Sequence, residues 1–221
     1  MKTIREIIRQ EIPVEFFIEW NNSLQEAYNL AVILVAKSDL EYPQAKNLLS
    51  YSYNNYIDQI LKHIARRYSC FDVRDAQAEN GHYFTILRTG SIILTQKAIS
   101  SSGSMIKPSK IRYSLARGNS YYCGGQCLTL FPADAMEIDP SRDKVYGILT
   151  HNRVSVFVKE EKVFSHLAFP DPNFDDYIEN INLIDYCNAG NTIKPVELPV
   201  AEIQDEVKPV LKIDITKEEV K

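Results

Sequence analysis

The spacing of hydrophobic residues changes near Cys70, and this change constrains the fold more than any other feature of the sequence. Before Cys70, apolar side chains recur every three or four residues, which is the period of an α-helix that packs one face on a core. After it, apolar and polar side chains alternate, which is the period of a strand with one buried face. Helical periods followed by strand periods predict an α+β protein in which a helical layer packs on an antiparallel sheet.

The first part of the chain predicts three helices. The first spans residues 2–11, and Pro13 ends its amphipathic pattern. The second runs from Val14 to about Lys37 and becomes apolar on all sides near its end. The third follows Pro43, a residue suited to the first turn of a helix. We expect the two long helices to pack as an antiparallel pair.

The second part of the chain predicts strands joined by turns. Residues 83–87 and 92–99 flank a four-residue turn and predict a β-hairpin. Alternating residues at 111–115 predict a further strand, which would leave Arg112 exposed on the face opposite its apolar neighbours. A second hairpin is predicted within residues 145–169.

Two further segments complete the predicted organisation. An acidic helix over residues 174–186 is expected to cap the sheet. From residue 188 onward, sparse apolar residues and prolines among charged ones predict an extended acidic tail. The predicted organisation is a helical layer at 1–70, a sheet with its capping helix at 71–187 in the same compact domain, and a tail at 188–221.

Composition bounds the class of protein. A chain of 221 residues with 45% hydrophobic residues can bury a substantial core. Its longest apolar run is far shorter than the roughly 20 residues that span a bilayer, and it begins with an amphipathic charged segment instead of a signal peptide. We therefore expect a cytoplasmic protein with no membrane contact. The four cysteines are expected to be reduced thiols.

Positive charge is concentrated in the middle of the chain. No Asp or Glu lies between Asn80 and Ala133, although the formal net charge of the whole chain is -4. This basic segment contains Arg88, Lys97, Lys107, Lys110, Arg112 and Arg117. Such side chains, together with serine hydroxyls on a flexible loop at 100–110, can hold phosphates, so we predict local contact with RNA or DNA. The alternative is a solvated sheet face whose charge meets the acidic tail.

No motif identifies a reaction. The chain lacks the nucleophile elbow, the Walker loop, the dinucleotide-binding glycine turn and the zincin helix, which lowers the expectation for those enzyme classes without excluding them. Whether the protein is an enzyme, and which residues would be catalytic, therefore stays open. His82 and His151 are both expected to be exposed, and either could act as a general base at the basic loop. For metal-free RNA cleavage, the parts would be His82, Arg88 and Arg112.

Two possible metal sites have weak support. Cys123 and Cys127 could share an ion with His82, His151, His166 or Cys187, but structural zinc sites usually offer two local pairs. Acidic Asp72, Asp75 and Glu79, with Lys97, could form a magnesium site, but acids in a turn are more often solvent-facing. The sequence therefore predicts no metal and no cofactor.

Three segments near the end of the predicted sheet carry a resemblance. Residues 146–152 (YGILTHN), 167–171 (LAFPD) and 182–186 (NLIDY) resemble small bacterial proteins encoded beside helix-turn-helix regulators. Such neighbours are often components of toxin–antitoxin or phage-defence modules, so the resemblance implies a protein partner and no active-site residue.

Together, the basic segment and the resemblance predict a cytoplasmic bacterial toxin-like or defence-associated protein that contacts nucleic acid through its basic hairpin and loop. The alternative is a non-enzymatic protein-interaction subunit, antitoxin-like or accessory, that works through its tail and helices. An extended tail can order on a partner, which supports this second interpretation.

Overall fold

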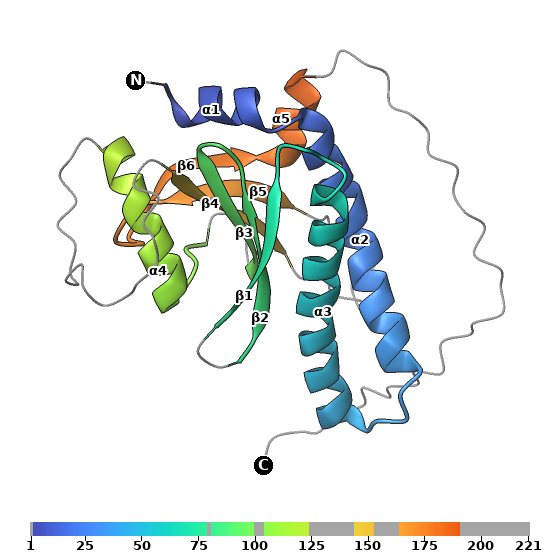
Figure 1. The fold of residues 1–221 in the computed structure, drawn as a ribbon. Helices are drawn as coiled ribbons and strands as arrows, with labels where there is room; N and C mark the ends of the chain where they lie inside the picture. The colour runs from blue at the N-terminus through green and yellow to red at the C-terminus, as the bar shows by residue number, and fades with distance from the viewer. Residues whose placement is uncertain (1, 79–80, 100–103, 124–143, 153–163, 191–221) are drawn as a thin grey trace.

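Helices cover both faces of one six-stranded sheet (Figure 1). The computed structural model describes residues 2–78, 81–99, 104–123, 144–152 and 164–190. The predicted α+β class, with an N-terminal helical layer on a sheet, is confirmed. None of the described helices is long and apolar enough to cross a membrane.

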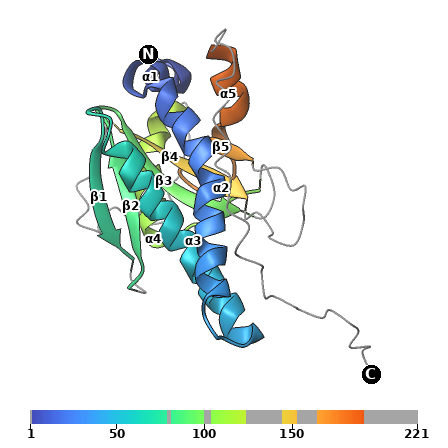
Figure 2. The same cartoon turned by 90° about the vertical axis from the view of Figure 1, so that its right-hand side faces the viewer.

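The helical layer forms as the periodicity predicts. It consists of α1 (Ile4–Glu11), α2 (Val14–Ala36) and α3 (Tyr42–Ala65). The Thr3 side chain caps the first helix, and Pro43 lies in the first turn of the third. The two long helices run side by side in opposite directions across one face of the sheet (Figure 2). The predicted antiparallel pair is therefore present.

The sheet follows chain order but is mixed. Its strands are β1 (Asp72–Gln77), β2 (Tyr83–Arg88), β3 (Ile92–Ile99), β4 (Val145–Asn152), β5 (Ser165–Pro170) and β6 (Tyr177–Asn182). Both predicted hairpin pairings, β2 with β3 and β4 with β5, are antiparallel, although residues 153–163 between the latter lie outside the described residues. The central pair, β3 and β4, is parallel, because the long connection through α4 returns the chain to the same end of the sheet.

Each face of the sheet has its own hydrophobic core. Leu87, Leu94 and Leu149 point toward the helical layer and pack in the larger cluster. Ile93, the residue before Leu94, and Tyr146, its partner on β4, belong to the second cluster and pack with Leu115 of α4. Because β4 lies between these layers, all of its residues are buried.

Two predicted elements are wrong. The strand predicted at 111–115 is helix α4 (Lys110–Ala116), which begins at the Ser109 cap and buries Leu115 against the sheet. Apolar residues four positions apart fit a helix as well as a strand, so this short pattern was ambiguous. Arg112 is consequently half-buried beside β3 and is not exposed as predicted.

The acidic helix predicted at 174–186 is also wrong. Strand β6 occupies its centre, and α5 (Leu183–Gly190) begins where the Asn182 side chain accepts hydrogen bonds from the backbone N–H groups of Ile184 and Asp185, at 2.9 and 3.3 Å. Residues 188–190 belong to α5, and the remainder of the predicted tail lies outside the described residues.

The sequence interpretation also missed an edge strand. Residues Asp72 and Asp75, expected in a turn, lie in β1, which pairs with β2 along its whole length. Backbone hydrogen bonds hold this strand, and charged side chains are common on exposed edges because they oppose further pairing. Its acidic residues are therefore compatible with a strand.

Candidate functional site: a cleft between two diverging strands

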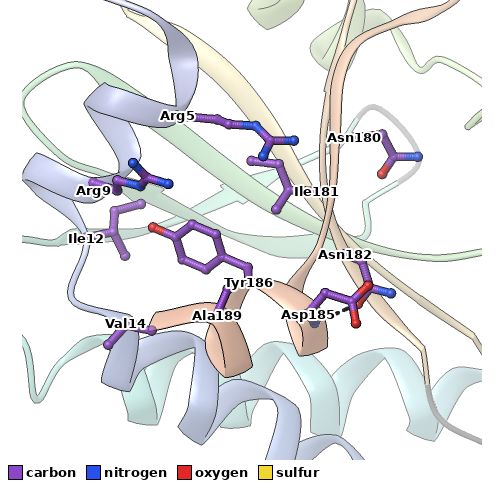
Figure 3. A pocket seen from close by; sticks show the side chains of 10 residues that line it. All are labelled: Arg5, Arg9, Ile12, Val14, Asn180, Ile181, Asn182, Asp185, Tyr186 and Ala189. Atoms are coloured by element: carbon purple, nitrogen blue, oxygen red, sulfur yellow. Dashed lines mark hydrogen bonds between the residues drawn. The ribbon is translucent and has the colours of Figure 1, made fainter. Parts of the chain in front are cut away.

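Two cavities of similar size open on the surface. The α1 cavity, of about 620 Å³, lies between α1, β6 and α5 (Figure 3). The β2–β3 cleft, of about 560 Å³, lies between α3, the β1–β2 hairpin, β3 and α4. The residues of this cleft that matter below are Tyr51, Asp58, His82, Phe84, Lys97 and Arg112.

Polar side chains around the α1 cavity interact with one another. Arg5 donates to the Glu179 carboxylate at 2.8 and 3.1 Å. Arg9 lies beside the Tyr186 hydroxyl (Figure 3), whose pKa is raised by burial and lowered in part by this arginine. Asn182 caps α5, as described above. Arg5, Arg9 and Asn182 at this cavity therefore already interact with other groups of the protein.

The β2–β3 cleft exists because the hairpin diverges. Near the turn, β2 and β3 pair at Leu87 with Leu94 and at Arg88 with Ile93, and the ladder between them stops there. Beyond this point β2 continues to pair with β1, whereas β3 continues to pair with β4. The two strands thus belong to separate halves of the sheet along the cleft.

Side chains from the covering helices replace the lost ladder partners. In a continued ladder, Thr85 and Gln96 would face each other. Instead, the Thr85 backbone N–H donates to Oδ1 of Asp58 at 3.4 Å, and the Gln96 carbonyl accepts from Nη2 of Arg112 at 3.4 Å. Buried backbone groups need partners, so α3 and α4 each supply one at the point of divergence.

Asp58 is the buried acid of the cleft. Its side chain lies on α3, and the residue is only 7% exposed. Oδ1 also accepts from Nε2 of Gln96 at 3.1 Å, whereas the buried Oδ2 accepts from none of the described residues. Burial raises the pKa of Asp58 above its ordinary value, and the bonds from Gln96 and Thr85 and the charges of His82 and Lys62 oppose this. Asp58, which lines the cleft, therefore has a buried acceptor atom without a partner among the described residues.

A chain of buried polar groups holds Gln96 in place from behind. Oε1 of Gln96 lies 3.1 Å from Nε2 of His151, and Nδ1 of His151 lies 2.7 Å from the Tyr28 hydroxyl. That hydroxyl donates to the backbone carbonyl of Asn152. His151 is fully buried and packs edge-on against Trp20, so its predicted exposure is wrong. It lies on the central strand β4, which is covered on both faces.

Two of the six predicted cations, Lys97 and Arg112, line the cleft. Lys107 and Lys110 are exposed, and in the sequence they flank Ser109, another lining residue. Nε of Arg112 is buried and has no hydrogen-bond partner among the described residues. Burial raises the pKa of the Tyr146 hydroxyl to about 12, and the positive charge of Arg112 partly opposes this increase.

The other two predicted cations lie elsewhere. Arg88 is at the far end of β2, next to the hairpin turn, and Arg117 begins the 3-10 helix η1 (Arg117–Cys123) after α4. The cleft thus contains the predicted pair His82 and Arg112 but not Arg88. The three parts suggested for metal-free cleavage do not converge at this cleft.

Two aromatic residues line the cleft. Tyr51 is 59% exposed, and its ring packs edge-on against His82 with centroids 6.2 Å apart. Phe84 lines the same cleft and is half-buried. Exposed and half-buried rings beside cations are the groups that stack on bases.

The suggested metal ligands do not gather in the parts of the chain that the structure describes. Asp72 forms an ion pair with Arg74, and Asp75 with Lys62, at 2.7 and 2.5 Å. Cys123 ends η1, whereas Cys127 and Glu79 lie outside the described residues.

Sequence reasoning missed Asp58, Gln96 and Tyr28. A signal for Asp58 was available, because it lies on the buried side of α3 with Ile57 and Leu61, where an acid is unexpected. Nothing local marks Gln96, whose role depends on residues from α3 and β4.

Comparisons with known proteins add no relative. The chain matches no protein-family model, and searches of curated proteins and solved structures find no significant match.

Proposed function

We propose that this protein binds single-stranded nucleic acid at the β2–β3 cleft. Phosphates would contact Lys97, Lys107, Lys110 and Arg112, and a base would enter the cleft itself. The observation that carries the proposal is that Arg112 and Asp58, from two different helices, each present a buried polar atom without a partner at this one cleft. A ligand with both acceptors and donors would satisfy these atoms.

The size and lining of the cleft favour a single strand over a duplex. A volume of about 560 Å³ is in the range of small-molecule pockets, so an unstacked base fits and a double helix does not. Tyr51 and Phe84 offer ring faces on which a base can stack. The cations then contact the backbone on either side of that base.

The charge of the whole chain requires local contact. Because the formal net charge is -4, non-specific attraction to nucleic acid is weak and these four cations must supply most of it. For single strands, four phosphate contacts predict a fall in log affinity of about 3 per unit of log salt concentration.

Fluorescence anisotropy tests the proposal directly. A labelled single strand of about 12 nucleotides is titrated with protein at two salt concentrations, beside the corresponding duplex. We expect salt-sensitive binding of the single strand that is strongly weakened by Lys97→Gln with Arg112→Gln. The matched control is Lys37→Gln with Arg74→Gln, which removes the same charge from exposed positions outside the cleft. Absence of wild-type binding overturns the proposal.

A second candidate function is a protein-interaction subunit. The observation in its favour is a group of exposed apolar residues between the end of α2 and the start of α3: Leu30, Ile33, Leu34, Leu40 and Tyr42. Exposed apolar clusters of this kind are typical of protein contacts. Co-purification with a neighbour-encoded protein that is lost on replacing Ile33 and Leu34 with Gln would support it. A toxin-like or defence-associated role stays a prediction from the resemblance.

A further inference from the structure

We propose that Asp58 reads the exocyclic amino group of the bound base, so that adenine, cytosine and guanine are preferred over uracil and thymine. This inference rests on the proposed function, because it concerns the base that enters the β2–β3 cleft. It identifies Asp58 as a specificity-determining residue.

The two carboxylate oxygens of Asp58 differ in their hydrogen bonds. Oδ1 accepts from the Thr85 backbone N–H at 3.4 Å and from Nε2 of Gln96 at 3.1 Å, whereas Oδ2 accepts from none of the described residues. Asp58 is only 7% exposed and its Oδ2 atom is buried, so this oxygen is shielded from bulk water. A buried acceptor of this kind is costly unless a donor reaches it.

The carboxylate of Asp58 is held in one orientation. Thr85 belongs to the β2 half of the split hairpin and Gln96 to the β3 half, so Oδ1 is held from both sides. Gln96 is held in turn by His151, and His151 by Tyr28. A carboxylate anchored through one oxygen presents the other at a defined place, which is what selective recognition requires.

The charge of Asp58 also points to a base as the ligand. A carboxylate among Lys97 and Arg112 opposes phosphate binding, so a purely phosphate-binding site gains nothing from it. An acid is useful where the ligand presents N–H donors. The amino groups of adenine, cytosine and guanine are such donors, whereas uracil and thymine flank their single imino N–H with two carbonyl oxygens, which a carboxylate repels.

Arg112 complements Asp58. Its Nε is a buried donor without a partner among the described residues, and its Nη2 is fixed on the Gln96 carbonyl at 3.4 Å. Each amino-bearing base carries a ring nitrogen or carbonyl acceptor close to its amino group. Asp58 and Arg112 thus bring one unpartnered acceptor and one unpartnered donor to the same cleft, and these are the two kinds of group that the donor–acceptor edge of such a base would pair with.

The first experiment uses only the wild-type protein. Anisotropy titrations compare oligo(dA) with an oligonucleotide of unsubstituted purine, which lacks only the amino group, and oligo(dC) with oligo(dT). Since a hydrogen bond to a charged group is worth about a factor of ten, we expect the amino-bearing strand of each pair to bind about tenfold more tightly.

The second experiment inverts the preference. In Asp58→Asn, Thr85 and Gln96 still require an acceptor at the Oδ1 position, so the amide nitrogen takes the place of Oδ2 and offers a donor to the cleft. We expect this variant to lose the preference for oligo(dA) over the purine strand and to favour oligo(dT) over oligo(dC). The control Asp75→Asn removes an exposed acid outside the cleft and should keep the wild-type order.

The outcomes separate this inference from the proposed function. Equal binding of both strands of each pair, with binding lost in the Lys97→Gln, Arg112→Gln variant, overturns the role of Asp58 and leaves the proposed function intact. Binding of none of the strands by the wild type overturns the proposed function and this inference together. An unchanged base order in Asp58→Asn, with a preserved melting temperature, also overturns the inference.

Discussion

The α1 cavity and the β2–β3 cleft are alike in volume and differ in how their polar groups are satisfied. In the first, Arg5 has Glu179 and Arg9 lies beside Tyr186. In the second, one oxygen of Asp58 and one nitrogen of Arg112 are buried without partners in the described chain. An unsatisfied buried group costs about 1–3 kcal/mol, so its presence in a cleft is more informative than the volume of the cleft.

Unpartnered buried polar atoms also occur outside the two cavities. Asn21, Arg88 and Asn173 also have a buried polar atom without a partner in the described chain, and none of them lines either cavity. What distinguishes the cleft is the combination of an unpartnered acceptor, an unpartnered donor, and the point where β2 and β3 stop pairing. The candidate site therefore depends on the divergence of these two strands.

The largest expected effect concerns ligand affinity. Replacing Lys97 and Arg112 with Gln should weaken binding of a single strand by about 30-fold or more, because two charge-assisted contacts are lost. Replacing Arg9 with Gln in the α1 cavity should change the affinity by less than about twofold, since that arginine is outside the proposed site. Anisotropy titrations of both variants at one salt concentration check this. Equal loss in both variants would break the comparison between the cavities.

A smaller effect is expected on stability. His151→Leu should lower the free energy of unfolding by about 2–4 kcal/mol, because Gln96 and Tyr28 would lose their shared buried partner. Tyr186→Phe, at the α1 cavity, should cost at most about 1 kcal/mol, since it removes a single partly exposed hydroxyl. Urea unfolding monitored by the fluorescence of Trp20 measures both changes. Similar costs for the two variants would show that the buried chain behind the cleft is not special.

The pH dependence of stability should report on Asp58. Burial raises the pKa of Asp58 in the folded state, so the folded protein holds this proton more tightly than the unfolded chain does. The resulting contribution to stability is fully present below the unfolded-state pKa and is lost as pH rises through the folded-state pKa. The stability of wild type relative to Asp58→Asn should therefore decrease from acidic to neutral pH. Urea unfolding of both proteins across this range measures the difference, and a constant or increasing difference would contradict the burial of this carboxyl.

Local sequence patterns predicted the long helices and most of the strands. They did not predict features that depend on contacts between residues far apart in the sequence. The apolar stripes of α2 and α3 span six or more turns, so their period is unambiguous, whereas Ile111 and Leu115 fit a strand or a helix equally well. The parallel pairing of β3 and β4 depends on a long connection whose path no local signal specifies.

The candidate site was predicted in part for the same reason. A run without acids drew attention to Lys97 and Arg112, which both line the cleft. Charge along the sequence could not show that Arg88 and Arg117 lie away from it, because position on a strand or helix decides where a side chain points. The pairing of Asp58 with Gln96 joins residues far apart in the chain, and only the fold brings them together.

The smallest effect is expected for the ion pair beside the α1 cavity. Glu179→Gln removes the carboxylate that Arg5 contacts at 2.8 Å. Both side chains are partly exposed, Arg5 at 53% and Glu179 at 27%. Exposed pairs contribute about 0.2–1 kcal/mol and are screened by salt, so the variant should lose less than about 1 kcal/mol at low salt and less still at high salt. Urea unfolding at two salt concentrations measures this, and strand binding by the variant should equal that of wild type. A marked loss of binding would mean that an arginine freed at the α1 cavity affects the ligand, and the separation of the two cavities would then be wrong.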